Sequence, residues 1–324
     1  MTPPLGNPAA ADAFLAALNS GNLHHAWLLA GPEGVGKATF AQAAALRMLA
    51  QGAAETLPRG LSVPDASRTH ALVAAGSHPD LRILSRLPKD DKPDAELARS
   101  ITIAQVRALQ PLFATVPSMS SRRVVIIDAI DDLERNGANA LLKNLEEPPA
   151  GTIFLLVSHA PGKLLPTIRS RCRLLRFEQL SDADTGAVLR RELPDAEPDE
   201  ITTLITAAEG SPGRGLRFAG LDLAKVDAAI ATIASNGDPD NVRRGGLARQ
   251  LAGKAAQGRY EAFLDRAPAF IARAACERQG DRLRTALDAH AAARNLAGAA
   301  RGLSLDASGT VWEMAGLVAR LHAA

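Results

Sequence analysis

The chain has 324 residues, of which 47% are hydrophobic and 22% are charged, proportions typical of a soluble globular protein of two or three domains and not of a disordered chain. Its 37 basic residues are nearly balanced by 35 acidic ones, which excludes a protein that binds nucleic acid through a large positive field. The apolar runs are short, no signal-like pattern opens the chain, and Cys172 and Cys276 form no CxxC pair, so we expect a cytoplasmic protein with no membrane segment and no cysteine-rich zinc site.

Predicted strands and helices alternate through the first half of the chain. In chain order we expect a helix at 9–20, a strand at 26–30, a helix at 38–48, an irregular excursion at 51–80, a strand at 81–84, an exposed loop at 88–96, a helix at 102–113, a strand at 124–127, a helix at 136–147, a strand at 153–157, a helix at 164–169 and an edge strand at 173–177. This alternation predicts a doubly wound α/β domain with a parallel sheet over residues 1–177.

The composition changes after this domain, because the β-branched runs end and Ala, Leu, Arg and Glu dominate. We expect two or three short helices between residues 181 and 220, within a small helical domain at 178–222 that is interrupted by a break at Gly210–Gly213. Longer helices follow and form an all-α domain at 223–324. The breaks predicted between them lie at 236–239, 245–246 and 301–309.

The loop between the first strand and its following helix carries the clearest chemical pattern. Gly31 to Lys37 spells G-x-x-x-x-G-K, the spacing of a phosphate loop. Gly31, Gly34 and Gly36 allow backbone N–H groups to converge on phosphate oxygens, and Lys37 is placed to reach the β- and γ-phosphates. The alternative is a glycine-rich turn before a surface helix, and the flanking strand and helix argue against it.

Two positions of this pattern lack the side chains that catalysis needs. The residue after the lysine is normally Ser or Thr, whose hydroxyl helps hold Mg²⁺, but here it is Ala38. The neighbouring Thr39 points about 100° away on a helix, so we do not expect it to substitute. Asp128, at the end of the strand at 124–127, is a Walker B candidate near the metal. The next residue, expected to be a water-orienting Glu, is Ala129.

Other polar residues are weaker candidates. Asp131 and Asp132 lie beyond the strand, where we expect a turn or a helix start. Ser158 follows the strand at 153–157, at the place of a polar sensor of the γ-phosphate. We expect His70 and His78 to be loop histidines and not metal ligands. Arg122 and Arg123 are expected to be solvated charges at a strand edge and not a DNA site.

The sequence resembles the clamp-loader branch of the AAA+ proteins, and within it the delta-prime subunits of bacterial DNA polymerase III. The resemblance covers almost all of residues 1–177 and is carried by HAWLLAGPEGVGKATFA, SHPDL, IAQVR, RRVVIID, ANALLKNLEEPP, LLPTIRSRC and GSPGR. It implies an AAA+ fold for this domain, a lid at 178–222 and an oligomerisation collar at 223–324. Family members usually carry a four-cysteine zinc module that this chain lacks, so we expect no zinc.

The resemblance also implies a role for each candidate residue. With Ala38 and Ala129, the chain looks like a non-hydrolysing stator that binds ATP or ADP, if at all, without turnover, through Gly31, Gly34, Gly36, Lys37, Thr39 and Asp128. Ser170, Arg171 and Cys172 match the Ser-Arg-Cys motif, in which Arg171 acts as an arginine finger on a neighbouring subunit's ATP. A surface arginine at a helix end is the alternative. We expect Cys172 only to pack, and Arg214 to lie near the second sensor position.

The implied partners are the delta subunit and the tau/gamma ATPase subunits in a hetero-pentamer, with the sliding clamp and primer-template DNA contacted through the complex. Two other interpretations remain open: an ATP-hydrolysing AAA+ clamp-loader subunit or other P-loop ATPase, and a P-loop kinase. Ala38 and Ala129 argue against the ATPase, and the helical second half is unexplained by the kinase. The sequence leaves open whether the chain has any enzymatic activity of its own.

Overall fold

A computed structural model describes residues 4–90, 97–303 and 305–323 of the chain. The chain divides into two compact units. The first extends to Val188 and includes Glu209–Gly213, and the second comprises Leu189–Ala208 and the chain from Arg214 onward. The finer division at residues 177 and 222 stays a prediction.

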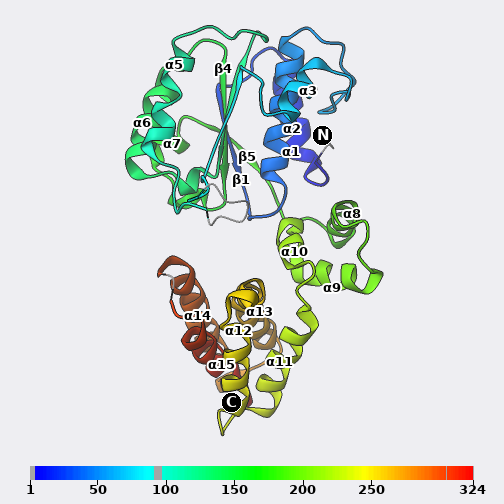
Figure 1. The fold of residues 1–324 in the computed structure, drawn as a ribbon, viewed down its shortest axis with the longest axis vertical. Helices are drawn as coiled ribbons and strands as arrows, with labels where there is room; N and C mark the ends of the chain where they lie inside the picture. Colours follow the sequence, from blue (N-terminus) through cyan, green and yellow to red (C-terminus); the bar gives the residue numbers. More distant parts are fainter. Residues whose placement is uncertain (1–3, 91–96, 304, 324) are drawn as a thin grey trace. The chain divides into compact units, whose positions relative to one another are not determined.

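A five-stranded, wholly parallel sheet forms the centre of the first unit, in the order β2-β3-β4-β1-β5 (Figure 1). Its strands are β1 (Ala26–Ala30), β2 (Leu81–Ser85), β3 (Arg123–Asp128), β4 (Thr152–Ser158) and β5 (Arg173–Arg176). The interior strands β1, β3 and β4 are almost entirely buried, as their continuous apolar runs predict, and β5 is the expected edge strand. The parallel α/β fold is therefore confirmed.

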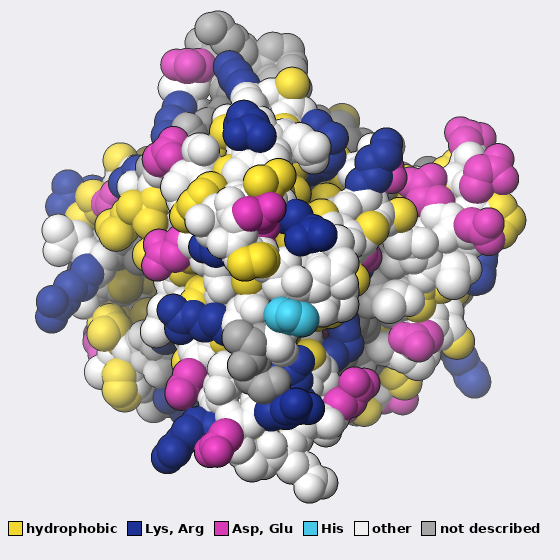
Figure 2. Space-filling view, turned by 90° about the horizontal axis from the view of Figure 1, so that it is seen from below, with side chains coloured by type: hydrophobic (Ala, Val, Ile, Leu, Met, Phe, Trp, Pro, Cys, Tyr) yellow, Lys and Arg dark blue, Asp and Glu magenta, His cyan; other side chains and the backbone are white. Residues whose placement is uncertain are grey.

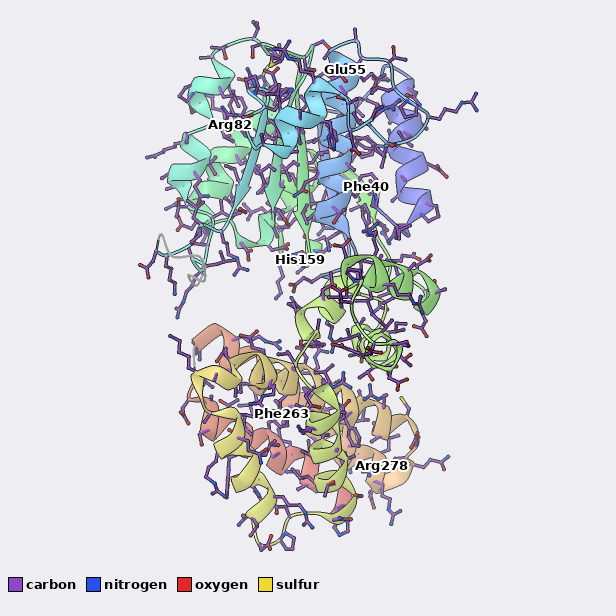
Figure 3. The ribbon with its side chains drawn as sticks, turned by 45° about the vertical axis from the view of Figure 1, so that its right-hand side comes forward. Phe40, Glu55, Arg82, His159, Phe263 and Arg278 are labelled. Carbon is purple, nitrogen blue, oxygen red and sulfur yellow. The ribbon has the colours of Figure 1, made fainter. Side chains whose placement is uncertain are left out.

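Helices cover both faces of this sheet (Figure 1). One face is covered by α1 (Pro8–Asn19), α2 (Lys37–Gly52) and α3 (Arg68–Ala74), and the other by α4 (Ile103–Arg107), α5 (Gln110–Phe113), α6 (Arg135–Glu146) and α7 (Pro166–Arg169). Because side chains alternate along a strand, Trp27 and Leu29 pack in the core beneath α1 and α2, and Leu28 and Ala30 pack in the opposite core. Phe40 of α2 belongs to the first of these cores (Figure 3).

The structure corrects two predictions in this unit. The helix expected at 102–113 is divided into α4 and α5, because Pro111 has no N–H group to continue the ladder. The excursion at 51–80 contains a helix, α3, whose first turn is capped by Ser67 accepting a hydrogen bond from the N–H of His70. Most of the loop expected at 88–96 lies outside the described residues. Its described part includes an isolated bridge between Pro88 and Leu97.

Helices alone follow β5 in the described chain: α8 (Asp182–Glu192), α9 (Pro198–Ala208), α10 (Pro212–Phe218), α11 (Leu223–Asn236), α12 (Val242–Leu251), α13 (Gln257–Cys276), α14 (Gly280–Leu303) and α15 (Ala307–Ala323). The core of the second unit is built from α11 to α15 around residues such as Phe263 (Figure 3). The break predicted at 245–246 is wrong, because Gly245–Gly246 lies inside α12. The break predicted at Gly210–Gly213 is present between α9 and α10, but it ends earlier than expected, because α10 already begins at Pro212, a residue tolerated in a first helical turn.

Charged residues of both signs are interspersed on the face of the molecule in Figure 2, with no large area of one sign. This agrees with the near-neutral composition. Within the described part of the chain, every helix is too short or too polar to cross a membrane.

Candidate functional site

The glycine-rich loop lies where the sequence predicts, between β1 and α2, and its glycines are required by its conformation. Gly34 and Gly36 have φ angles of 81° and 93°, which side-chain-bearing residues rarely adopt. A Cβ atom on Gly31 would lie 2.1 Å from the carbonyl oxygen of Phe177. The loop therefore has the glycine-dependent form expected of a phosphate loop, and α2 begins at Lys37 directly after it.

The Lys37 side chain is turned back onto this loop. It is only 2% exposed, and its Nζ donates hydrogen bonds to the carbonyl oxygens of Gly31, at 2.7 Å, and Pro32. Burial lowers the pKa of Lys37 to about 8, although the carboxylates of Asp131 and Glu33 act in the opposite direction. A phosphate group would have to compete with two carbonyl groups that already hold this ammonium.

The start of α10 contacts the glycine-rich loop through a backbone hydrogen bond. The N–H of Gly213 donates a hydrogen bond of 2.9 Å to the carbonyl oxygen of Gly34. A Cβ atom on Gly213 would lie 2.9 Å from the Cα atom of Gly34, so only glycine allows this approach without a shift. In the sequence, Gly213 belongs to a predicted break and to the segment GSPGR, and neither reveals its contact with Gly34, which is far away in the chain.

The carboxyl ends of β1, β3 and β4 bring the other nucleotide-site candidates to the same edge of the sheet. Asp128 is the last residue of β3 and is half-buried. Burial raises its pKa, against the opposing effect of His159 and Lys37. Ala129, which follows, is buried. On α2, Ala38 is half-buried and Thr39 is exposed.

The acidic residues beyond β3 are both engaged in other contacts. Asp131 accepts hydrogen bonds from the Ser158 hydroxyl at 2.9 Å, the His159 N–H at 2.6 Å and the Ala160 N–H at 3.1 Å. Asp132 forms an ion pair of 3.1 Å with Arg86. The hydroxyl of Ser158, the fully buried last residue of β4, thus donates its hydrogen bond to the Asp131 carboxylate. The bonding role of Asp131 was not predicted, since it depends on a residue of another strand.

Arg171 lies just beyond the C-terminal end of α7, in the Ser-Arg-Cys sequence. Its guanidinium contacts the Glu146 carboxylate at 2.7 Å, the Thr167 carbonyl oxygen at 2.9 Å and the Ser170 hydroxyl at 3.4 Å. The side chain is 34% exposed, so it is accessible from outside but is held by Glu146, a partner that the sequence did not reveal. Cys172 packs against the core beneath α6 and α7, and burial raises the pKa of its thiol to about 12.

The remaining arginine candidates lie in different surroundings. Arg123 is buried, not solvated as expected, and its guanidinium donates to the carbonyl and hydroxyl oxygens of Thr115. Arg122 is half-buried. Arg123 is covered because β3 is an interior strand and the loop before it, which contains Thr115, packs over the start of the strand. Arg214 belongs to the second unit, where its Nε atom lies 4.0 Å from Asp265, so its sensor role stays a prediction.

The two histidines singled out in the sequence have structural contacts. His70 lies in α3, 3.5 Å from Asp65, and not in a loop as expected. His78 is buried, and its Nδ1 atom accepts a hydrogen bond from the N–H of Asp80. Across the described residues, no group of three or more His, Cys, Asp or Glu side chains is arranged to hold a metal ion.

Comparison with known proteins connects these features to a family. A family model described as "DNA polymerase III, delta subunit" matches residues 6–181. The chain is 35% identical over 196 residues to DNA polymerase III subunit delta' of Pseudomonas aeruginosa, covering 60% of this chain and 56% of that protein. It is 34% identical over 164 residues to subunit delta' of Bacillus subtilis, covering 51% and 45%. It is 30% identical over 235 residues to subunit tau of Escherichia coli, covering 71% and 34%.

The chain thus spans about half the length of the delta' relatives that it matches. Among solved structures, it is similar to a DNA polymerase III gamma subunit-related protein from Thermotoga maritima, with a TM-score of 0.46, 14% identity and coverage of 97% and 99%. The RuvB Holliday junction branch migration motor of the same organism matches with a TM-score of 0.41, 16% identity and coverage of 78% and 72%.

Proposed function

The chain belongs to the DNA polymerase III delta-prime subunit family, and we propose that it acts as a non-hydrolysing stator in a clamp loader, supplying Arg171 to the ATP site of a neighbouring subunit. Its partners in this role are the delta and tau/gamma subunits of a cytoplasmic hetero-pentamer that loads the sliding clamp onto primer-template DNA. The likeness to tau subunits supports a shared assembly of related chains.

The non-hydrolysing role is supported by one observation: two side chains needed for catalysis are absent, and two nearby polar side chains already form hydrogen bonds within the protein. Ala38 offers no hydroxyl for Mg²⁺ and Ala129 offers no carboxylate for water. Asp131, an acidic residue just beyond β3, already accepts three hydrogen bonds at the end of β4. Lys37 is held by the carbonyl groups of its own loop. ATP or ADP that bound here would therefore not be turned over.

An ATP-hydrolysing subunit or another P-loop ATPase is the second candidate, favoured by the intact glycine loop and by Asp128 at the end of β3. Steady-state ATP hydrolysis by the purified full chain separates the two. We expect no measurable turnover, whereas a rate on the order of 1 s⁻¹ would be typical of an ordinary enzyme and would refute the stator role. Calorimetric titration with ATP, comparing the wild type with Lys37→Ala, tests nucleotide binding separately.

The arginine-finger role is tested in the assembled complex. Arg171→Ala should leave assembly intact and lower the DNA- and clamp-stimulated ATP turnover, since arginine fingers contribute roughly 10³ to 10⁵ in rate at a single site. The observed loss will be smaller because the other ATP sites keep their own arginines. Arg171→Lys should rescue only in part, since an ammonium lacks the planar fork of the guanidinium. Wild-type turnover by the Ala variant in a complete complex would reduce Arg171 to a structural helix end.

A further inference from the structure

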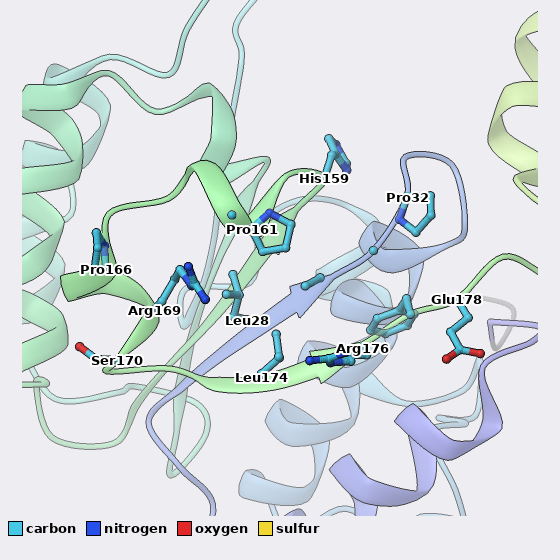
Figure 4. A pocket seen from close by; sticks show the side chains of 14 residues that line it. Leu28, Pro32, His159, Pro161, Pro166, Arg169, Ser170, Leu174, Arg176 and Glu178 are labelled. Carbon is cyan, nitrogen blue, oxygen red and sulfur yellow. The ribbon is translucent and has the colours of Figure 1, made fainter. Parts of the chain in front are cut away.

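A hollow of about 940 Å³ lies on the face of the sheet opposite α2, beside the edge strand β5 (Figure 4). Leu28 and Ala30 of β1 line it, and both belong to the core on the α6 and α7 side. Gly31 and Pro32, at the start of the phosphate loop, and His159, just after β4, also line the hollow, so it adjoins that loop, whereas the helix α2 packs on the other face of the sheet. Its wall is formed by α7 and by the short 3-10 helix η2 (Pro161–Lys163).

Two arginines direct their side chains into this hollow from opposite sides (Figure 4). Arg169 is the last residue of α7 and Arg176 is the last residue of β5, and both are exposed. Neither guanidinium forms an ion pair or a hydrogen bond with any residue that the structure describes. Glu178, the acidic residue of the lining, has its carboxylate turned away from both guanidinium groups in Figure 4. The hollow thus offers two forked donors without an acceptor.

The floor between these arginines is apolar. Leu28 is almost fully buried beneath it, Leu174 of β5 is 46% exposed, and Pro161 and Pro166 form the far wall. An exposed leucine beside unpaired arginines favours an occupant that brings a carboxylate together with apolar groups. A free phosphate or a small anion would satisfy the guanidinium groups and leave Leu174 in water.

The hollow also reaches the residue before Arg171, because Ser170 lines it. If Arg171 serves the ATP site of a neighbouring subunit, the surface of that subunit must lie against this part of the chain. We infer that the hollow receives an acidic side chain flanked by apolar residues from that same ATPase subunit. This inference rests on the proposed function. It adds a contact that would hold the partner subunit in place, and this contact is separate from Arg171, which would act on the partner's nucleotide.

The test measures binding of the full chain to the tau/gamma ATPase subunit of the same bacterium by biolayer interferometry. Arg169→Glu, Arg176→Glu and Leu174→Ser should each weaken binding by about tenfold or more, as for interface residues at an anchoring contact. The two charge reversals should also flatten the dependence of affinity on salt concentration. All three side chains are exposed, so the variants should fold, and thermal unfolding checks this.

Arg173→Glu is the matched control, since it makes the same charge change on the same strand but on the opposite face. Arg173 pairs in register with Trp27, and its guanidinium lies 5.0 Å from the centre of that ring. We expect this variant to bind within about twofold of the wild type. Equal weakening by Arg173→Glu and Arg176→Glu would indicate a nonspecific charge effect and overturn the inference.

The remaining outcomes separate this inference from the proposed function. Normal binding by the hollow variants, together with a low ATP turnover for Arg171→Ala, would reject the anchor and leave the stator role intact. No association of the wild type with the ATPase subunit would reject both. Calorimetric titration with ATP covers the last case. If Arg176→Glu abolished the heat of ATP binding and Lys37→Ala kept it, the hollow would be a site for a small anion, and the docking role would be refuted.

Discussion

Asp131 is the residue whose removal should most disturb the end of β4. Its carboxylate accepts three hydrogen bonds, one of them from the fully buried Ser158 hydroxyl. Asp131→Ala leaves these donors without an acceptor, so we expect the free energy of unfolding to fall by about 1–3 kcal/mol. Asp132→Ala removes a partly exposed ion pair with Arg86 and should lower the free energy of unfolding by less than about 1 kcal/mol. Urea denaturation measures both, and equal losses would contradict the assigned role.

Lys37 gives the stability a specific dependence on pH. Its pKa is about 8 in the folded chain, against 10.5 for an unperturbed lysine. Between these values the unfolded chain holds a proton that the folded chain has lost, so the Lys37 contribution to the free energy of unfolding rises with pH. The rise is at most about 1.4 kcal/mol per pH unit.

Urea denaturation at several pH values from 7.5 upward, on the wild type and on Lys37→Met, measures this contribution. The variant should lack the rise, whereas Lys143→Met, which removes an exposed lysine of α6, should keep the wild-type dependence. A wild-type and a Lys37→Met profile that run parallel would show that the folded chain keeps the proton on Lys37.

At the scale of the elements, two glycines in helices should respond to alanine in opposite directions. Gly298 lies inside α14, where an added Cβ would meet no atom within 4 Å, so Gly298→Ala should stabilise the chain by about 0.5–1 kcal/mol. On Gly213, in the first turn of α10, an added Cβ would lie 2.9 Å from the Cα atom of Gly34, so Gly213→Ala must shift this backbone contact and should destabilise the chain. Thermal unfolding distinguishes the two signs. A stabilising Gly213→Ala would show that the helix start moves freely away from the loop.

At the scale of the whole molecule, the two tryptophans provide a direct test of the collar prediction. Trp27 is 1% exposed in the sheet core of the first unit, whereas Trp312, on α15, is 40% exposed. The Cζ atom of Arg244 lies over the Trp312 ring, 5.1 Å from the ring centre. If the helical domain carries the assembly through this surface, acrylamide quenching of the Trp312 emission should decrease when the complex forms.

The partner subunits for this measurement should be tryptophan-free or labelled so that their emission does not interfere. Trp312→Phe reports Trp27 alone and should show no change on assembly, because that ring is already buried. Unchanged quenching of the wild type in a complete complex would place the assembly contacts on another surface of the chain.

Local sequence patterns determined the α/β fold and most of the candidate nucleotide site. Buried strands need continuous apolar runs and a phosphate loop needs glycines at fixed spacing, so β1, β3, β4 and the loop from Gly31 to Lys37 could be located from neighbouring residues alone. The missing hydroxyl at Ala38 and the missing carboxylate at Ala129 are likewise properties of single positions. The break predicted at Gly245–Gly246 is wrong because the helix penalty of glycine is modest and does not by itself end a helix.

The tertiary structure alone decided how the candidate side chains are engaged. Arg171 is held by Glu146, and the Ser158 hydroxyl by Asp131, through partners that are distant in the sequence. Arg123 looked like a solvated charge, and it is buried because a loop from before β3 folds over it. The hollow between Arg169 and Arg176 exists only because α7 and β5 are brought together. A sequence pattern reports the preferences of adjacent residues, whereas these contacts depend on which distant segments the fold places side by side.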